Sequence, residues 1–301
     1  VKNLSLNIND KPILKNISFD IKAGEIFGLV GESGSGKSLS ASTITQLLPE
    51  HCRLSGSIIF ESKNILKNNE TEMNKIRGRK ISMIFQEPMT ALNPLKTIGD
   101  QVAETFKIHL GLNYREALRQ AEIELIKVGL DPTVISRRNY PHELSGGQRQ
   151  RVMIAIAIAL KPTLLIADEP TTALDVTTQS KILVLLRDLV RTEKIALCLI
   201  THDLAVIAEM ADRLAIMRNG EIVDKGTPSS IFLSLSNEHT RKILSDAISP
   251  PQKLSKIHDC KLLRANSISK TFNNPFNFLK KYKNNKPTLN NITFSLLTGE
   301  C

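Results

Sequence analysis

The sequence predicts an α/β fold, in which a mainly parallel sheet carries helices on its faces and two subdomains are attached to it. Short apolar runs alternate with segments of helical period over residues 26–225, which is the pattern of a parallel sheet with crossover helices. Residues 1–26 instead alternate apolar and polar side chains, as half-buried antiparallel strands do. A long stretch at 97–158 is helical in period, which predicts an inserted helical subdomain.

The individual elements follow in order along the chain. Antiparallel strands within residues 1–26 are joined by a polar turn at 9–12, and a short buried strand covers 26–30. A glycine-rich loop then leads into a helix, because glycines permit a tight strand-to-helix turn. The remaining predicted strands cover 57–61, 81–85, 163–167, 195–200, 213–218 and 221–225, and the remaining helices lie within 97–130 and cover 147–160, 179–192 and 203–211.

Composition limits the class of protein. Aromatic residues make up 4% of the chain and Trp is absent, which disfavours a β-sandwich with an aromatic core. Four scattered cysteines fit neither a disulfide framework nor a paired metal site, so we expect a reducing, cytosolic environment. The longest apolar run, Val152–Leu160, has nine residues, about half of what a membrane-spanning helix needs. The cysteines are Cys52, Cys198, Cys260 and Cys301.

Positive charge is concentrated at the end of the chain. The formal net charge is +10, of which residues 261–301 carry +6 and residues 1–260 carry +4. Such a basic tail could contact nucleic acid or anionic lipid. A solvated loop is the favoured interpretation, because runs of like charge usually have that structure.

An internal repeat indicates a duplicated domain. Residues 12–25 and 287–300 are identical at seven of 14 positions with a constant offset of 275, whereas chance gives about one identity. We therefore expect one domain over 1–235, a linker over 236–262, and the truncated start of a second copy of that domain over 263–301. By the same offset Cys301 corresponds to Ile26, so the second copy contains no catalytic residue.

Residues 31–38 form a phosphate-binding loop. They follow a predicted strand, precede a predicted helix and match the pattern GxxxxGK[ST], which is the context that this motif requires. The glycines allow backbone N–H groups to surround phosphates, and the helix N-terminus adds a positive dipole. Lys37 is expected to reach the β- and γ-phosphates and Ser38 to ligate Mg²⁺. The eight residues are Gly31, Glu32, Ser33, Gly34, Ser35, Gly36, Lys37 and Ser38.

Two carboxylates end the apolar strand at residues 163–167. A carboxylate at the carboxyl edge of a strand can hold Mg²⁺, and the next one can orient and deprotonate a water for in-line attack. We assign Asp168 to the metal and Glu169 to the water. An isolated Asp-Glu pair is usually a solvated turn, but a phosphate-binding loop in the same chain makes the catalytic interpretation the stronger one.

Leu144-Ser145-Gly146-Gly147-Gln148 opens a predicted helix and forms a second anion-binding helix N-terminus. It does not serve the phosphate held by the first loop, so a second subunit's nucleotide is the simplest ligand. Together with residues 31–38, Asp168-Glu169, the segment 171–175 and Thr201-His202-Asp203, in this order, it resembles the ATPases of ABC transporters over about residues 1–230. That resemblance implies a RecA-like P-loop NTPase core with an antiparallel β-subdomain and an inserted helical signature subdomain.

The resemblance also implies roles for individual residues. Gln86 lies at the Q-loop position, where it contacts Mg²⁺ or the attacking water and senses the transmembrane partner. Asp175 faces the partner ATPase, and His202 is the switch histidine near the γ-phosphate. Ser145, Gly147 and Gln148 close on the partner's ATP. The implied catalytic set is Glu169, His202, Gln86 and Lys37, and the implied Mg²⁺ set is Ser38, Gln86 and Asp168.

Finer features resemble one subfamily, the ATPases of oligopeptide, dipeptide and nickel importers. These features are residues 86–94, 140–143 and 166–177. Some members fuse two ATPases in one polypeptide, which fits the restart at residue 263. The resemblance implies ATP and Mg²⁺ as cofactors, a homo- or heterodimer of ATPase domains, and transmembrane permease subunits. It further implies an extracytoplasmic solute-binding protein as an indirect partner, a peripheral location on the cytoplasmic face of the inner membrane, and no nucleic-acid partner.

Two features depart from that pattern. Family members usually place an aromatic residue that stacks on adenine near the end of the first strand, but here that position is Ile8, whereas Phe272 occupies it in the second copy. We expect the loss of stacking to cost about 1 kcal/mol or more, on the scale of aromatic–base contacts. Residues 230–262 contain only Cys260, so we predict that the iron–sulfur cluster of some peptide-importer ATPases is absent.

Two alternative functions remain open at this point. One is a soluble ABC ATPase that acts on ribosomes or nucleic acid, against which the importer-like segment after Gln86 argues. The other is an inactive, truncated tandem ATPase, against which the intact motifs of the first copy argue. The sequence leaves open the cargo, the identity of the partner ATPase, whether the chain extends before Val1 or beyond Cys301, and the effect of Ile8 on ATP binding.

Overall fold

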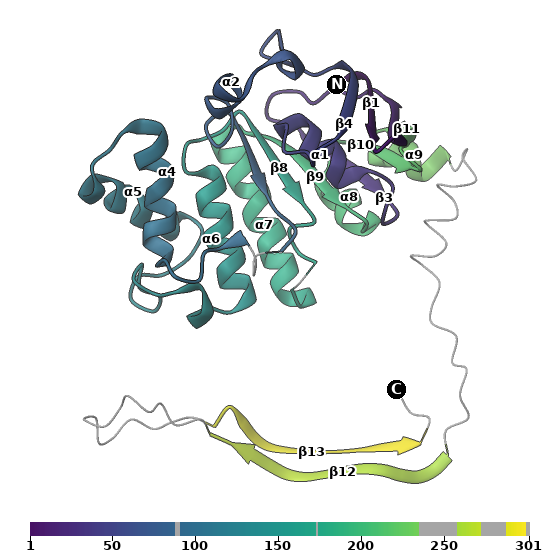
Figure 1. The fold of residues 1–301 in the computed structure, drawn as a ribbon. Helices are drawn as coiled ribbons and strands as arrows, with labels where there is room; N and C mark the ends of the chain where they lie inside the picture. The colour runs from purple at the N-terminus through teal and green to yellow at the C-terminus, as the bar shows by residue number, and fades with distance from the viewer. Residues whose placement is uncertain (88–90, 173, 235–257, 272–286, 299–301) are drawn as a thin grey trace. The chain divides into compact units, whose positions relative to one another are not determined.

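The computed structural model describes residues 1–87, 91–172, 174–234, 258–271 and 287–298. The chain divides into two compact units, Val1–Ala247 and Ile248–Cys301, and each is described here by itself. The first unit contains the α/β domain, and the second contains a two-stranded hairpin (Figure 1).

A six-stranded sheet forms the centre of the first unit, in the order β11-β10-β3-β9-β8-β7. Five strands are parallel and only β11 is antiparallel to its neighbour. Every residue of β3, β8 and β9 is buried, as is usual for parallel strands covered on both faces. The strands are β3 (Ile26–Gly31), β7 (Ile81–Ile84), β8 (Leu164–Asp168), β9 (Ala196–Thr201), β10 (Arg213–Arg218) and β11 (Glu221–Gly226).

Alternate side chains of these strands enter two separate hydrophobic cores. Ile26 and Val30 of β3 pack in one core with α6, α7 and α8. Phe27 and Leu29 pack in the other with α1 and the antiparallel sheet, because successive side chains of a strand point to opposite faces. The sheet is therefore the middle layer of three. The helices are α1 (Lys37–Thr45), α6 (Gly146–Ile158), α7 (Val176–Glu193), α8 (Leu204–Met210) and α9 (Pro228–Ser234).

The antiparallel subdomain is a three-stranded sheet of order β2-β1-β4, built from β1 (Lys2–Ile8), β2 (Lys11–Ile17) and β4 (Cys52–Ser57). One strand was expected over 57–61. Instead β4 ends at Ser57 and a small hairpin of β5 (Ile59–Phe60) and β6 (Lys63–Asn64) follows. The break occurs at Ile58, whose side chain is 3% exposed in the core. A 3₁₀ turn (Ile65–Lys67) and α2 (Glu70–Asn74) lead on to β7.

The helical subdomain lies between β7 and β8 in the chain, as expected. It contains α4 (Ile98–Leu110), α5 (Tyr114–Lys127) and α6, whose N-caps are Thr97, Asn113 and Ser145. These side chains accept hydrogen bonds from first-turn N–H groups that lack a partner within the helix. Lys127 of α5 also pairs with Glu193 of α7 at 3.4 Å, which ties the subdomain to the core.

The second unit is an antiparallel hairpin of β12 (His258–Lys270) and β13 (Leu289–Thr298). Its local geometry repeats that of β1 and β2. In each hairpin, hydroxyl side chains accept two cross-strand hydrogen bonds from backbone N–H groups at left-handed residues. The bonds are Asn3 N to Ser18 Oγ (2.8 Å) and Asn16 N to Ser5 Oγ (2.9 Å), and Ser267 N to Thr293 Oγ1 (2.9 Å) and Asn291 N to Ser269 Oγ (2.9 Å).

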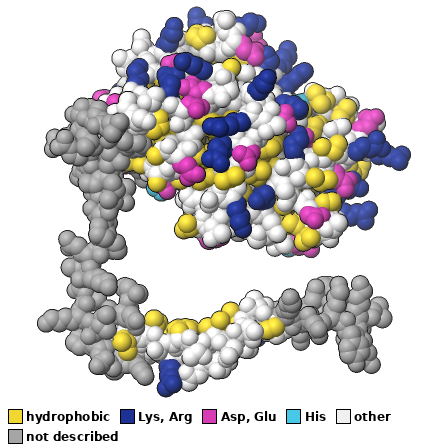
Figure 2. Space-filling view, turned by 180° about the vertical axis from the view of Figure 1, so that it is seen from behind, with side chains coloured by type: hydrophobic (Ala, Val, Ile, Leu, Met, Phe, Trp, Pro, Cys, Tyr) yellow, Lys and Arg dark blue, Asp and Glu magenta, His cyan; other side chains and the backbone are white. Residues whose placement is uncertain are grey.

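The two hairpins differ in how much apolar surface they expose. Phe19 and Ile17 are 5% and 1% exposed in the first unit, whereas the matching Phe294 and Ile292 are 46% and 42% exposed. Figure 2 shows hydrophobic side chains in a row along this hairpin. Strand β12 begins at His258, within the range expected for a linker, and residues 236–257 lie outside the described part of the chain.

No helix in the described ranges is both long enough and apolar enough to cross a lipid bilayer.

Candidate active site

The predicted site residues meet at the carboxyl ends of the parallel strands. β3 leads into the glycine-rich loop, β8 ends at Asp168, and Gln86 and His202 follow β7 and β9 by one or two residues. In open α/β sheets this edge is where ligands bind. A cavity of about 180 Å³ opens there, lined by Ile13, Ser33, Gly34, Gly36, Lys37, Ser38, Leu39, Gln86 and Glu169.

Glycines shape the loop around this cavity. Gly34 and Gly36 have φ of 79° and 102°, a region that other residues enter only with strain. A Cβ at Gly36 would lie 2.7 Å from Leu14 Cδ2. Gly36 is also the N-cap of α1 and provides no side-chain cap, so the first-turn N–H groups of the helix remain free for an anion.

Lys37 occupies the interior of this loop. Its Nζ donates hydrogen bonds to the carbonyl oxygens of Gly31 (2.8 Å) and Glu32 (2.9 Å). Burial lowers the pKa of Lys37, and the charges of Glu169 and Asp168 oppose that fall. The buried Ser35 hydroxyl has no hydrogen-bond partner among the described residues. A desolvated ammonium, an unpaired hydroxyl and free N–H groups together fit a polyanionic ligand such as a nucleoside triphosphate.

Ser38 and Asp168 are far apart in the sequence, but their side chains are in contact. Ser38 Oγ donates to Asp168 Oδ1 at 3.1 Å. Burial raises the pKa of Asp168 above its ordinary value; the Ser38 hydroxyl opposes this rise, Glu169 adds to it and Lys37 opposes it. Because burial is the largest cause of this rise, the ionised carboxylate lacks solvation that a bound cation could replace. A hydroxyl and a carboxylate are hard oxygen donors of the kind that Mg²⁺ prefers, so the pair fits that ion.

Glu169 is held by three side chains. Its Oε2 accepts hydrogen bonds from Gln86 Nε2 (3.1 Å) and Thr172 Oγ1 (2.9 Å). Its Oε1 lies 3.3 Å from His202 Nδ1. The Glu169 side chain is 13% exposed and that of His202 is 60% exposed. The structure therefore brings together Lys37, Ser38, Gln86, Asp168, Glu169 and His202.

Two residues of the site were not predicted. Thr172 contacts Glu169. It lies three residues after Glu169 in the sequence, and a hydroxyl residue at this spacing within a turn could have identified it. Ile13 lines the cavity, although sequence reasoning considered only Ile8 at the base-contacting end of β1. Ile8 is half-buried, pairs with Lys11 and Cys52, and does not line the cavity.

The signature residues Ser145, Gly147 and Gln148 lie apart from this cavity and do not line it. Ser145 caps α6 in a reciprocal pair with Gln148. Gln148 N donates to Ser145 Oγ at 3.3 Å, and Ser145 N donates to Gln148 Oε1 at 2.8 Å. Asp175 caps α7 through Thr178 N at 3.0 Å. Pro88, Met89 and Thr90 after Gln86, together with Ala173, Phe272 and Cys301, lie outside the described residues.

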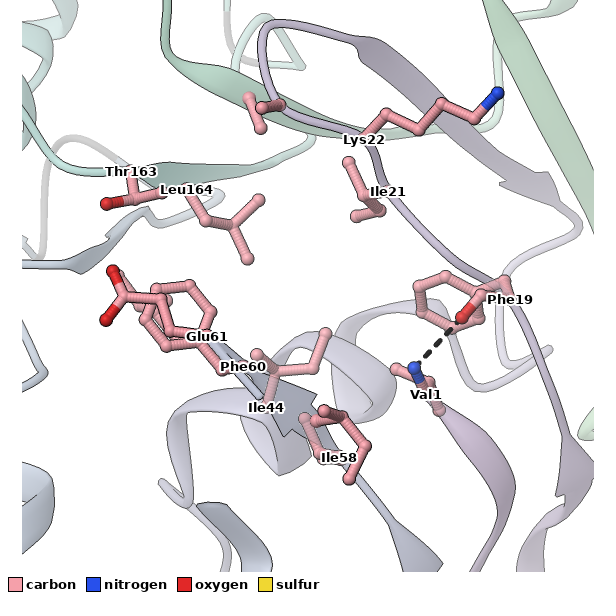
Figure 3. A pocket seen from close by; sticks show the side chains of 14 residues that line it. Val1, Phe19, Ile21, Lys22, Ile44, Ile58, Phe60, Glu61, Thr163 and Leu164 are labelled. Carbon is pink, nitrogen blue, oxygen red and sulfur yellow. Dashed lines mark hydrogen bonds between the residues drawn. The ribbon is translucent and has the colours of Figure 1, made fainter. Parts of the chain in front are cut away.

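A second cavity lies at the opposite edge of the sheet (Figure 3). Its lining includes Ile81, Leu164 and Ala196, the first residues of β7, β8 and β9. Its volume is about 220 Å³, and its walls are mostly apolar. Because the chemistry gathers at the carboxyl ends of the strands, this pocket is separate from the candidate site.

The glycine-rich loop, the strand-terminal carboxylates and the helical insert define a P-loop NTPase with a RecA-like core. The sequence model of the ABC transporter family matches residues 14–172, which is more than half of the chain. The chain belongs to the ABC transporter family and carries its ATPase domain.

The chain is similar to several known proteins of this family. It is 46% identical over 237 residues to the oligopeptide transport ATP-binding protein AppD of Bacillus subtilis, which covers 78% of this chain and 72% of that protein. It is 39% identical to the uncharacterized ABC transporter ATP-binding protein YejF of Escherichia coli, over 100% of this chain and 58% of that protein. The chain therefore spans little more than half of that relative.

One solved structure similar to this chain is the ATP-binding cassette MJ0796, in a dimeric post-hydrolysis state bound to ADP and Pi. The TM-score is 0.65 at 29% sequence identity, and the match covers 75% of this chain and 98% of that one. The α/β fold predicted from the sequence is thus confirmed.

Proposed function

We propose that this chain powers an ABC-type importer by Mg²⁺-dependent ATP hydrolysis, and that the cargo is a peptide. The single observation that carries the hydrolytic part is the Glu169 carboxylate, fixed by three side chains at the wall of the cavity that also holds Lys37 and Ser38. The names of relatives such as the oligopeptide transport protein AppD support the cargo class.

In the proposed mechanism, backbone N–H groups of residues 33–38 and the Lys37 ammonium bind the phosphates of ATP. Ser38 and Asp168, with Gln86, would hold Mg²⁺, which would supply positive charge to the phosphates. Glu169 orients a water for in-line attack on the γ-phosphorus and accepts its proton, and the bond from the γ-phosphorus to the bridging oxygen breaks so that ADP leaves. His202 and Gln86 contact Glu169 and keep its carboxylate directed toward that water.

The signature residues complete the site of a second ATPase domain. Ser145 Oγ is occupied as an acceptor by Gln148 N, but its own O–H remains a donor for a phosphate oxygen. Ser145 is exposed, and with Gly147 and Gln148 it lies outside the chain's own cavity, so two domains would pair head to tail around two ATP molecules. The dimeric assembly of the ATP-binding cassette MJ0796 supports this arrangement.

We place the permease contact beside the Q-loop. Phe85 and Leu95 flank the segment that follows Gln86 and are 46% and 86% exposed, which is unusual for large apolar side chains unless they meet a partner. In this position Gln86 links the permease to Glu169. Transmembrane permease subunits would bring the chain to the cytoplasmic face of the membrane, and an extracytoplasmic solute-binding protein would deliver the peptide.

Residues 263–301 are proposed to begin a second ABC ATPase domain. The β12–β13 hairpin has the same cross-strand hydrogen bonds as β1–β2, and its exposed Phe294 and Ile292 match residues that are buried in the first copy. In the first copy the matching side chains are buried against other elements of the domain. The RecA-like core of a second domain would bury Phe294 and Ile292 in the same way.

The Glu169→Gln variant tests the function. Loss of the carboxylate that accepts the proton should lower kcat by about 100-fold or more, while the Kd for Mg·ATP should stay within about twofold because the phosphate loop is intact. Steady-state phosphate release and equilibrium nucleotide binding measure the two quantities.

The matched control is Glu116→Gln, which changes an exposed carboxylate on α5. Undiminished turnover would remove Glu169 from the role, and a wild-type chain that takes up no Mg·ATP would refute the function.

A further inference from the structure

We infer that Thr172 is a positioning residue for hydrolysis, which acts by holding the Glu169 carboxylate through its hydroxyl group. The inference depends on the proposed function of Glu169. It concerns a residue that makes no predicted contact with nucleotide or metal and does not line the cavity.

The hydroxyl of Thr172 spans the backbone and the side chain of Glu169. Its Oγ1 lies 2.9 Å from Glu169 Oε2 and 3.2 Å from the Glu169 carbonyl oxygen. The shorter contact is to the carboxylate, and hydrogen bonds to ionised acceptors are the stronger kind. The single hydroxyl proton is therefore directed mainly to Oε2.

The backbone of Glu169 makes this support necessary. Glu169 has φ of 44°, a left-handed conformation that is unfavourable for a residue with a Cβ. Its N–H donates to Ile200 O at 2.9 Å, and its carbonyl oxygen accepts from Thr172 N at 3.3 Å. Thr172 thus closes the turn through hydrogen bonds from both its amide and its hydroxyl. These bonds fix the backbone of Glu169 and therefore the position of its Cβ.

The other two partners of the carboxylate belong to different segments. Gln86 is exposed and precedes residues 88–90 of the Q-loop, and the His202 side chain is 60% exposed. Thr172 is the only one of the three that shares a turn with Glu169. With Gln86 and Thr172 both on Oε2, Oε1 is the oxygen with more remaining capacity to accept a proton from water.

Thr172 also lies on the path from Glu169 to α7. Leu174 N donates to Thr171 O at 3.1 Å, and Asp175 caps α7 through Thr178 N at 3.0 Å. In the sequence, the segment 171–172 lies between Glu169 and the N-terminal cap of α7. The Thr172 hydroxyl is the point at which that segment contacts the carboxylate.

The test compares Thr172→Val, which keeps the shape but removes the donor, with Thr172→Ser, which keeps the donor. In the full-length chain, Thr172→Val should lower kcat by about tenfold, as loss of one hydrogen bond to a charged group does, with KM and the Kd for Mg·ATP nearly unchanged. Thr172→Ser should restore kcat to within about twofold. Thr192→Val, which removes an exposed hydroxyl near the opposite end of α7, should match wild type.

A second comparison separates positioning from a general structural effect. In a Glu169→Gln background, Thr172→Val should change the residual rate less than twofold, because its effect acts through the carboxylate. Wild-type kcat in Thr172→Val, or failure of Thr172→Ser to restore it, would overturn the inference while leaving the function intact. Absence of turnover in the wild-type chain, or full turnover in Glu169→Gln, would instead overturn the proposed function.

Discussion

At the scale of single residues, the candidate site contains a buried charge, the Asp168 carboxylate, whose desolvation is unfavourable for folding. Asp168 is 5% exposed, and burial raises its pKa. Without a cation, its ionised form therefore costs folding free energy, because burial desolvates the carboxylate and outweighs the opposing effects of the Ser38 hydroxyl and the Lys37 ammonium. Function and stability make opposite demands at this position.

Asp168→Asn should consequently stabilise the nucleotide-free protein. Because the folded-state pKa is raised, the carboxyl contributes stability below its ordinary pKa of 3.8 and loses it as the pH rises through the folded-state pKa. At neutral pH we therefore expect the variant to have a higher free energy of unfolding and a higher Tm than wild type.

Thermal melts in EDTA from neutral pH down toward the ordinary pKa of 3.8 measure this gain, which should shrink as the pH falls. In Mg·ATP the order should reverse, because only the wild type gains the full stabilisation by bound ligand. A variant that is less stable than wild type in EDTA at neutral pH would contradict this view of Asp168.

At the scale of elements, the signature helix is fitted closely to its neighbour. A Cβ at Gly147 of α6 would lie 2.4 Å from Thr178 Cγ2 of α7, well inside van der Waals contact. Thr178 N is in turn held by the Asp175 cap. Glycine at position 147 is thus required by packing between α6 and α7, in addition to any contact with a partner's nucleotide.

Gly147→Ala should therefore lower the free energy of unfolding by about 1–2 kcal/mol, even though alanine favours helices more than glycine does. Adding Thr178→Ser removes the methyl group that clashes and should recover most of the loss. Urea unfolding of the two single variants and the double variant measures the coupling. If the Gly147→Ala variant had the same free energy of unfolding as wild type, α6 and α7 would be able to move apart without loss of stability, which contradicts this prediction.

At the scale of the whole molecule, the two units differ in how far their apolar side chains are buried. The first has two hydrophobic cores on a six-stranded sheet. The second presents a hairpin whose large apolar residues, Phe294 and Ile292 among them, remain largely exposed. An isolated hairpin with an apolar face is marginally stable in water and prone to pair with other chains.

A chain of residues 1–247 should bind Mg·ATP with the affinity of the full chain and melt within about 1 °C of its main transition, since the ATPase cores lie in that unit. It should also aggregate less, because the exposed hairpin is gone. Calorimetry and light scattering measure these effects. A large fall in Tm on removal of residues 248–301 would mean that the two units stabilise one another.

The sequence was sufficient to predict most of the fold, and it named the phosphate loop and the two carboxylates at the end of β8 as part of the candidate site. The order of strands and helices, the phosphate loop, Asp168 and Glu169 follow from local patterns, because hydrophobic period and glycine spacing are properties of neighbouring residues. The break at Ile58 was missed, because it involves a single residue between two strands. The helix α2 was missed too, because only five residues form it.

What only the tertiary structure decided is which side chains touch. Gln86, Thr172 and His202 come from three different segments, and their convergence on Glu169 depends on the sheet order that places β8 between β7 and β9. The same holds for Gly147 against Thr178 and for Ile13 in the cavity wall. Local sequence sets backbone preference over a few residues, whereas contacts between distant segments depend on how the layers pack.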